Sequence, residues 1–428
     1  MKTSNLKSFS IYGLFGTQDV HIPFDEDIKI LIGENGLGKT QILGMLYCLL
    51  NGNIEKLSDY SFDRLELVFV DNGKLGISKK ELFIFLQNKP QIRWDQVFPL
   101  KKNIEKNFIY RSRIIPLVIE SGNNEEEEID NNEEEEIDNN VSTFFNKLKE
   151  KLKNLSILYF PTYRRVEEDL KNLGYDEDQF PKGKNELIQF GMEDVKKRFT
   201  DIENSIDALL KEGFSKISGE ILSQLVSGFE KADRSFLEKI DENDIEIILS
   251  RVGKELSDGE KNKIRNIITY QKIENPSLFY FLRKLIEIYE KQKPLDDFVK
   301  VYRDVCNKYL VNKKVFYDES AIKIYIKLDA TGEEIELSKL SSGEKQIISI
   351  LSKIYLSAKE ERFIILFDEP ELSLSMTWQK QLLPDIIDSK KCDFLLAVTH
   401  SPFIFDNKLD RYAVGLNEYI KPVEKVNV

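Results

Sequence analysis

The sequence contains little cysteine, little histidine and no long hydrophobic run. Its 428 residues include 3 cysteines and 2 histidines. The cysteines have no metal or redox spacing, so we expect them to be reduced and buried: Cys48, Cys306 and Cys392. The apolar runs are short, as at residues 363–367 and 394–398. A membrane-spanning helix needs ~20 residues, so we expect no membrane partner.

The N-terminus has no apolar signal core in residues 1–6, so we expect a cytoplasmic protein. Hydrophobic residues make up 41% and aromatic residues 11% of the chain. This composition is sufficient for a sizeable core and argues against global disorder. At ~100–200 residues per domain, the length predicts two or three structural units.

The formal charge of −12 is concentrated in one segment. Residues 123–140 contain two copies of an eight-residue acidic unit, with ten acids and no base, which leaves −2 for the rest of the chain. Such a charge run is typical of a solvated surface segment. We therefore predict a disordered acidic loop at about 121–141.

Hydrophobic patterning predicts an α/β protein with a helical insertion. Short apolar runs predict strands at 28–32, 65–70, 82–86, 156–160, 363–367 and 394–398. Residues 322–328 alternate and precede a turn at 329–332, which predicts a hairpin. Helical periodicity appears at 187–210 and 278–289. We assign residues 1–165 and 312–428 to the two parts of one discontinuous α/β head, and 166–311 to an inserted helical domain.

A phosphate-binding loop follows the first buried strand. Residues 33–40 read Gly-Glu-Asn-Gly-Leu-Gly-Lys-Thr, which fits the P-loop pattern, and a helix is predicted at 40–50. Glycines let backbone N–H groups face a phosphate, and the helix N-terminus adds positive potential. The predicted ATP-binding residues are Gly33, Asn35, Gly36, Gly38, Lys39, Thr40 and Gln41. Lys39 should reach the β- and γ-phosphates, and Thr40 should ligate Mg²⁺.

An acidic pair ends the strand at 363–367. Asp368 should hold the magnesium shell, and Glu369 should orient the attacking water. A strand followed by an acidic turn is common in proteins. Its occurrence together with a P-loop in one chain favours an ATPase with ATP and Mg²⁺ as cofactors.

A Leu-Ser-Ser-Gly-Glu segment opens the helix predicted at 342–358 and resembles the ABC signature motif. Together with the P-loop, the Asp-Glu pair and the later His400, it is similar to the ATPase heads of the ABC, SMC and RecF-like superfamily. The resemblance implies a homodimer or higher oligomer in which one subunit caps the γ-phosphate bound by another. The signature residues acting in trans would be Ser341, Ser342, Gly343 and Glu344. The same residues also fit a helix capping box.

The resemblance further assigns His400 as the switch histidine that contacts the γ-phosphate and takes part in catalysis. A near-copy of the signature at residues 256–261 lies about 110 residues before Asp368, whereas a signature helix leads almost directly into the acidic strand. We predict that this copy is a helix capping box.

Two segments resemble a narrower family. Arg164 and Arg165 lie where a Q-loop would be, no glutamine is present, and they are candidate sensors of phosphate or of the dimer partner. Residues 369–379, Glu-Pro-Glu-Leu-Ser-Leu-Ser-Met-Thr-Trp-Gln, resemble the OLD class of antiphage ATPases, such as PtuA of Septu and AriA of PARIS. Only 28 residues follow His400, so we expect no Toprim nuclease in this chain. The resemblance implies a sensor or scaffold that controls a separate HNH or Toprim nuclease effector.

Other functions remain open at this point. They are a RecF- or SMC-like DNA repair ATPase, a transporter subunit, and a scaffold that binds ATP without turnover. Glycines interrupt the predicted insertion, which disfavours a long coiled coil. Lysine clusters at 101–102, 147–153 and 196–198 leave DNA binding open, since they also suit solvated helix faces. A phage protein is a further candidate partner.

Overall fold

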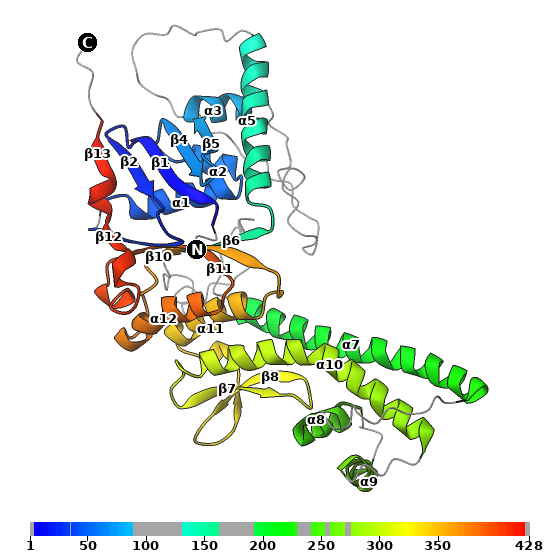
Figure 1. The fold of residues 1–428 in the computed structure, drawn as a ribbon. Helices are drawn as coiled ribbons and strands as arrows, with labels where there is room; N and C mark the ends of the chain where they lie inside the picture. Colours follow the sequence, from blue (N-terminus) through cyan, green and yellow to red (C-terminus); the bar gives the residue numbers. More distant parts are fainter. Residues whose placement is uncertain are drawn as a thin grey trace, which may run out of the picture. The chain divides into compact units, whose positions relative to one another are not determined.

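The computed structural model describes residues 4–34, 36–88, 131–161, 192–228, 241–252, 257–269 and 275–423 (Figure 1). Two compact units are present. The first comprises residues 1–162, 362–370 and 392–428, and the second comprises 163–361 and 371–391. Residues 312–361, which the sequence analysis placed in the head, therefore group with the second unit. The reason is that β7 and α11 of this segment pack on the long helices of the insertion.

A parallel five-stranded sheet forms the centre of the first unit. Its order is β12-β3-β11-β10-β6, and every neighbouring pair is parallel. The strands are β3 (Ile28–Ile32), β6 (Leu155–Phe160), β10 (Arg362–Asp368), β11 (Cys392–Thr399) and β12 (Ala413–Gly415). Continuous apolar runs are expected where both faces of a parallel strand are buried, and β10 and β11 confirm that prediction.

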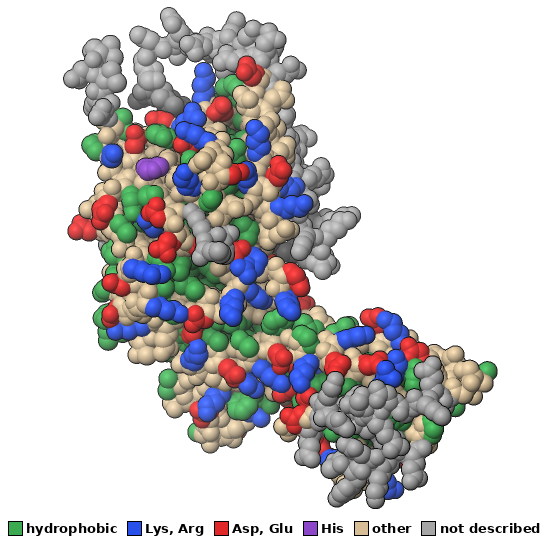
Figure 2. All heavy atoms as spheres, in the orientation of Figure 1, with side chains coloured by type: hydrophobic (Ala, Val, Ile, Leu, Met, Phe, Trp, Pro, Cys, Tyr) green, Lys and Arg blue, Asp and Glu red, His purple; other side chains and the backbone are tan. Residues whose placement is uncertain are grey.

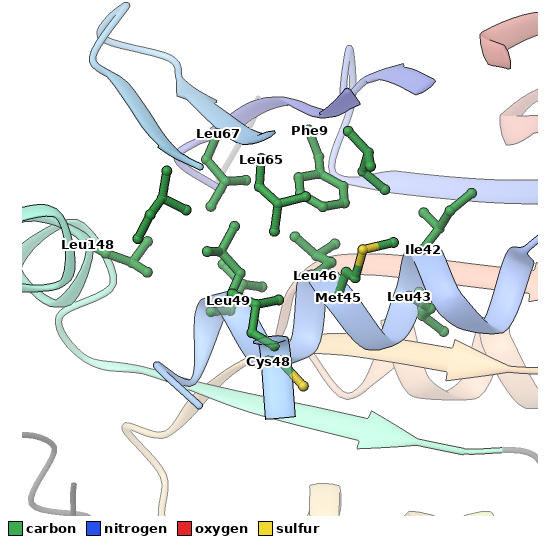
Figure 3. Packing of buried hydrophobic residues seen from close by; sticks show 14 of the residues in the cluster. Phe9, Ile42, Leu43, Met45, Leu46, Cys48, Leu49, Leu65, Leu67 and Leu148 are labelled. Carbon is green, nitrogen blue, oxygen red and sulfur yellow. The ribbon is translucent and has the colours of Figure 1, made fainter. Parts of the chain in front are cut away.

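A second, antiparallel sheet belongs to the same unit, with the order β13-β2-β1-β4-β5. Its strands are β1 (Leu6–Leu14), β2 (Gln18–Pro23), β4 (Arg64–Phe69), β5 (Lys74–Ser78) and β13 (Ile420–Pro422). Helix α1 (Lys39–Leu50) contributes to one buried cluster with residues of both sheets. Figure 3 shows Leu46 and Leu49 of α1 near Phe9 and Leu65 of the antiparallel sheet. This apolar packing fixes the helix whose N-terminus carries the P-loop.

The strand predicted at 82–86 is wrong, because these residues lie in helix α3 (Lys79–Asn88). A reciprocal capping box begins this helix. The Glu81 carboxylate accepts from the Ser78 amide at 2.7 Å, and the Glu81 amide donates to the Ser78 hydroxyl at 3.2 Å. A Ser-x-x-Glu pair before an apolar run is a helix-start pattern. It outweighs the β propensity of the aromatic residues that follow.

The disordered loop predicted at about 121–141 is wrong for its second half. The second acidic unit is part of helix α5 (Asn131–Lys151), and the first lies outside the described residues. Ile137, Val141, Phe145 and Leu148 are buried and recur at a helical spacing that continues from the acidic unit. Glutamate is also a good helix former. The apolar stripe therefore extends helical structure into the charge run.

Long helices dominate the second unit. They are α7 (Met192–Ser227), α8 (Glu242–Val252), α9 (Asp258–Thr269), α10 (Pro276–Cys306), α11 (Ser342–Tyr355) and α12 (Met376–Asp388). Helix α10 packs against α7 and α11. A small antiparallel sheet consists of β7 (Lys313–Asp318), β8 (Lys323–Leu328) and β9 (Glu334–Ile335). The pairing of β8 with β9 confirms the predicted hairpin.

The remaining elements are short. They are helix α2 (Ile54–Ser58) and the 3₁₀ turns at Leu337–Lys339, Pro402–Ile404, Asp410–Tyr412 and Leu416–Tyr419. Across the parts of the chain given above, no helix combines the length and apolar character needed to cross a membrane. On the face shown in Figure 2, basic and acidic side chains are intermixed.

The near-copy of the signature is a capping box, as predicted. Ser257 precedes α9, and the Glu260 carboxylate accepts from the Ser257 amide at 2.8 Å. The Glu260 amide donates to the Ser257 hydroxyl at 3.4 Å. These contacts satisfy backbone donors at the helix start, which accounts for the sequence pattern.

Candidate ATP-binding site

Three parallel strands bring the predicted catalytic residues to one edge of the sheet. β3 pairs with β11, and β11 pairs with β10. The P-loop follows β3, Asp368 ends β10, and His400 follows β11. The carboxyl ends of parallel strands meet at the same edge, which is where ligands bind in open α/β sheets. These residues are far apart in the sequence, but the strand order brings them to the same edge of the sheet.

The P-loop has the backbone conformation that its glycines permit. Gly36 and Gly38 have φ of 92° and 77°, in the left-handed region that favours glycine. Lys39 is buried, and its Nζ donates to the carbonyls of Gly33 at 2.6 Å and Glu34 at 3.1 Å. These bonds hold the ammonium inside the loop.

The first turn of α1 presents the remaining predicted nucleotide contacts. Thr40 and Gln41 are exposed at the start of the helix. Asn35 lies outside the described residues. Backbone N–H groups at a helix start have no intrahelical partner and can bind an anion.

Thr40 and Asp368 form the pair that would hold the metal. The Thr40 hydroxyl donates to Asp368 Oδ1 at 3.2 Å, and Asp368 is buried. Among the described residues, no group of three or more His, Cys, Asp or Glu side chains could hold a metal ion. Mg²⁺ is usually bound by one or two protein oxygens together with phosphate and water. A hydroxyl and a carboxylate side by side fit that requirement.

Glu369 occupies an unusual backbone conformation. Its φ is 51°, although it is not glycine, and its amide donates to the carbonyl of Val398 at 2.8 Å. A left-handed conformation in a non-glycine residue costs free energy and is enriched at functional sites. The bond to β11 holds this residue at the edge of the sheet.

His400 lies between Glu369 and Lys39. Its Nε2 is 3.5 Å from Glu369 Oε1 and contacts Lys39 Nζ. An ammonium only donates, so Lys39 is the donor in its contact with the His400 ring. The three predicted residues form one connected group.

The signature-like residues lie in the second unit. Ser341 caps α11, with both bonds of a capping box present, so that prediction is confirmed. Lys313 on β7 donates to both Glu344 carboxylate oxygens, at 2.8 and 3.0 Å. Burial opposes ionisation of Glu344, but the bonds from Lys313 and Ser341 hold its pKa below the ordinary value. The start of α11 is thereby fixed to the small sheet.

A tight contact explains the glycine of this motif. A Cβ at Gly343 would lie 2.4 Å from the backbone carbonyl oxygen of Ser373 and 3.1 Å from the Trp378 ring. Ser373 itself has φ of 68°. The chain after Glu369-Pro370 therefore packs directly on the start of α11, and only glycine allows this approach.

The sequence analysis missed Phe15, which lies beside the P-loop. It is in the turn between β1 and β2, has φ of 55° and is 45% exposed. A Cβ placed on Gly38 would be 3.1 Å from the Phe15 ring. The glycines on either side, Gly13 and Gly16, indicate a turn at this aromatic residue, but they do not indicate that its ring lies against the P-loop.

The predicted site residues thus fall into three groups. The structure brings Lys39, Thr40, Asp368, Glu369 and His400 together in the first unit. Residues 341–344 lie in the second unit. Arg164 and Arg165 lie outside the described residues, and their sensor role stays a prediction.

This fold and site define a P-loop ATPase with an ABC-type head and a helical insertion. The family model described as "AAA ATPase domain" matches residues 5–405. The chain belongs to this AAA ATPase family. No curated protein shows significant sequence similarity to it.

Two solved Smc head structures are similar to the chain. One is an SmcHead bound to the C-winged helix domain of ScpA, with 10% identity, 94% of this chain and 90% of that chain covered, and a TM-score of 0.36. The other is an Smc head domain with an extended coiled coil, bound to the C-terminal domain of ScpA derived from Pyrococcus furiosus. It has 12% identity, 98% and 96% coverage, and a TM-score of 0.37.

Proposed function

We propose that this ATPase binds ATP with Mg²⁺ at the edge formed by β3, β10 and β11. The convergence of Lys39, Thr40, Asp368 and Glu369 at that edge carries the proposal. Lys39 would exchange its carbonyl contacts for phosphate oxygens. Thr40 and Asp368 would hold Mg²⁺, and the bound ion would neutralise part of the phosphate charge.

Glu369 would orient and polarise the attacking water, because it follows the metal-binding acid directly. His400 would contact the γ-phosphate by donating from Nε2, with a proton on that nitrogen once Lys39 has moved to the phosphate. Phe15 would offer the adenine base a flat apolar surface, since its exposed ring lies beside the P-loop. These roles assign one function to each polar side chain at the sheet edge.

The signature residues would act on a second copy of the chain. Ser341, Ser342 and Gly343 begin α11, where backbone donors and the helix dipole favour an anion. Their position at a helix start supports a cap for the γ-phosphate that the partner copy binds. This arrangement requires a homodimer or a higher oligomer with composite sites.

At the level of the cell, we propose that the ATPase is the sensor or scaffold of an antiphage system. It would hold or release a separate HNH or Toprim nuclease. The support is the resemblance of residues 369–379 to the OLD class. The close approach of the Ser373 backbone to Gly343 gives that segment a physical link to the signature helix. Nucleotide state could thereby reach a surface that binds the effector.

The test is native mass of the Glu369→Gln protein, purified with the product of its neighbouring gene, with and without ATP. We expect an oligomer that contains the neighbour and whose nuclease activity changes with ATP. The Lys39→Ala protein is the matched control, since it should not respond to ATP. A neighbour that never copurifies would contradict the scaffold role while leaving the ATPase intact.

A RecF- or SMC-like repair ATPase is the alternative. It predicts a bare dimer that forms only with ATP and captures DNA in place of a protein. The same native-mass measurement with added duplex DNA separates the two functions. A neighbouring membrane permease would instead favour a transporter subunit.

A further inference from the structure

The small sheet of the second unit has one buried face and one face with aromatic and basic side chains. Val315, Tyr317, Ile324 and Ile326 are buried, and β7 lies against α10 (Figure 1). Side chains alternate along a strand, so the residues between these point to the other face. They include Lys314 and Phe316 on β7, and Lys323, Tyr325 and Lys327 on β8.

Two aromatic rings meet at the centre of this outer face. Phe316 is opposite Tyr325 in the strand register, and their rings are nearly parallel, with an interplanar angle of 11° and centroids 6.1 Å apart. Phe316 is 37% exposed. Single exposed apolar side chains are common, but two rings packed side by side form a contiguous apolar feature of the kind that marks binding surfaces. Their central position makes them the main apolar feature of the face.

Lysines surround the aromatic pair. Lys327 Nζ lies 4.9 Å from the Tyr325 centroid and 5.4 Å from the Phe316 centroid. Lys314 is directly opposite Lys327, and Lys323 is opposite Asp318 in the strand register. Three ammonium groups therefore lie on the face that carries the two rings.

Carboxylates lie at the margin of the face and balance part of this charge. Lys314 is 3.8 Å from Asp329, and Lys323 is 3.7 Å from Glu334. All four side chains are more than 40% exposed. Exposed pairs at such distances contribute little free energy. A phosphate that makes a direct hydrogen bond to these lysines can displace the carboxylates.

We propose that this outer face binds single-stranded nucleic acid. Bases would stack on Phe316 and Tyr325, and Lys314, Lys323 and Lys327 would contact the flanking phosphates. Aromatic rings with interspersed cations recognise single strands without sequence preference, because every base has a π-face. A duplex hides those faces, so the single strand is the preferred ligand.

An ion pair connects the sheet to the start of the signature helix. Lys313 on β7 is the residue that holds both oxygens of Glu344. The edge of β7 that does not pair with β8 is held by Asn307. Its side chain accepts from the Val315 amide at 2.8 Å and donates to the Val315 carbonyl at 3.0 Å. Nucleic acid bound to the face would therefore lie on a strand that contacts Glu344 of the signature-like segment.

The experiment is fluorescence anisotropy of a labelled dT oligonucleotide with the full chain, without nucleotide so that ATPase function does not enter. We expect Phe316→Ala with Tyr325→Ala to weaken binding roughly tenfold or more. Lys314→Ala with Lys327→Ala should lower the slope of log affinity against log salt by about one to two. The matched controls are Phe83→Ala, whose side chain is 58% exposed, and Lys80→Ala, both on α3.

Circular dichroism melting of each variant identifies any loss of folding. A wild-type protein that does not bind the oligonucleotide overturns the proposal. Equal affinity of the aromatic double variant and the Phe83→Ala control also overturns it, as does tighter binding of a duplex than of a single strand. Binding of a protein from the neighbouring gene to this face, lost in the aromatic variant while oligonucleotide binding is retained, would assign the face to a protein partner.

Discussion

Glu369 combines a predicted catalytic role with a left-handed backbone conformation that glutamine can also adopt. Glu369→Gln keeps the shape and the bond to Val398 but removes the carboxylate. We expect ATP binding to persist and turnover to fall by about 10²–10⁴, the usual contribution of a general base. Steady-state phosphate release and equilibrium nucleotide binding measure the two quantities. The exposed acid Glu360, changed to Gln, is the matched control, and comparable turnover by the Glu369 variant would contradict the assignment.

Lys391 makes the free energy of unfolding depend on pH, and the sign of that dependence follows from its burial. Its Nζ donates to the carbonyl and hydroxyl of Ser357, both at 2.8 Å, and burial lowers its pKa from 10.5 to about 8. Between these values the unfolded chain binds more protons than the folded one, so stability rises with pH. Relative to Lys391→Met, the wild-type free energy of unfolding should increase from pH 8 to pH 10. Denaturant titrations measure it, with Lys380→Met on the surface of α12 as control. A constant difference across that range would contradict the lowered pKa.

The sequence motifs predicted which residues form most of the site, but they did not predict where the backbone places every residue. The P-loop, Asp368, Glu369 and His400 were named from sequence, and the strand order explains their convergence. Phe15 was missed because its position depends on a turn with positive φ at Gly13, Phe15 and Gly16. No local pattern encodes which loop an exposed aromatic ring will lie against. Backbone conformation, and not composition, places that residue beside Gly38.

At the scale of elements, apolar runs predicted the buried strands well, but helix α3 and the first part of helix α5 were assigned incorrectly. β3, β10 and β11 were apparent from continuous apolar runs. Helix α3 was assigned as a strand for two reasons. A run of five apolar residues fits the helical and the strand period equally well, and the Ser78-Glu81 capping box was overlooked. The acidic half of α5 was assigned to a loop from its charge alone, although Ile137 and Val141 continue the apolar stripe of the following helix. Charge runs therefore have to be read together with their neighbours.

Gly343 tests the packing of the signature helix on the segment after β10. In Gly343→Ala the new methyl group would meet the Ser373 carbonyl oxygen at 2.4 Å, and this overpacking should cost ~1–3 kcal/mol of stability. Gly219→Ala in α7 is the matched control, because nothing lies within 4 Å of its Cβ position. That change should stabilise the helix by ~0.5–1 kcal/mol. Chemical unfolding of both variants measures the difference, and a neutral Gly343→Ala would show that the contact is loose.

For the whole molecule, the sequence predicted a discontinuous ATPase head but not how its parts group. Residues 312–361 were assigned to the head because they contain the signature. In the structure they belong with the helical insertion, since β7 and α11 pack on α10. Long-range packing of this kind leaves no pattern in a single sequence. The consequence is that the phosphate-binding residues and the signature lie in different compact units.

Because these residues lie in different units, the composite site can be tested through the association of two copies of the chain. If the signature acts on a second copy, ATP should drive association of the Glu369→Gln protein, and Ser341→Arg should prevent it by placing a bulky side chain at the start of α11. Nucleotide binding by each monomer should remain, because the P-loop belongs to the other unit. Native mass and fluorescent-nucleotide titration give the two readouts.

The near-copy of the signature provides the control for that change. Ser257 caps α9 as Ser341 caps α11, so Ser257→Arg loses a helix cap of the same kind, worth ~1 kcal/mol. A general loss of stability would therefore affect both variants alike. Only a specific contact between copies predicts that Ser257→Arg associates with ATP and Ser341→Arg does not. If both variants associate with ATP as the Glu369→Gln protein does, the proposed composite site is incorrect, and hydrolysis occurs within one copy of the chain.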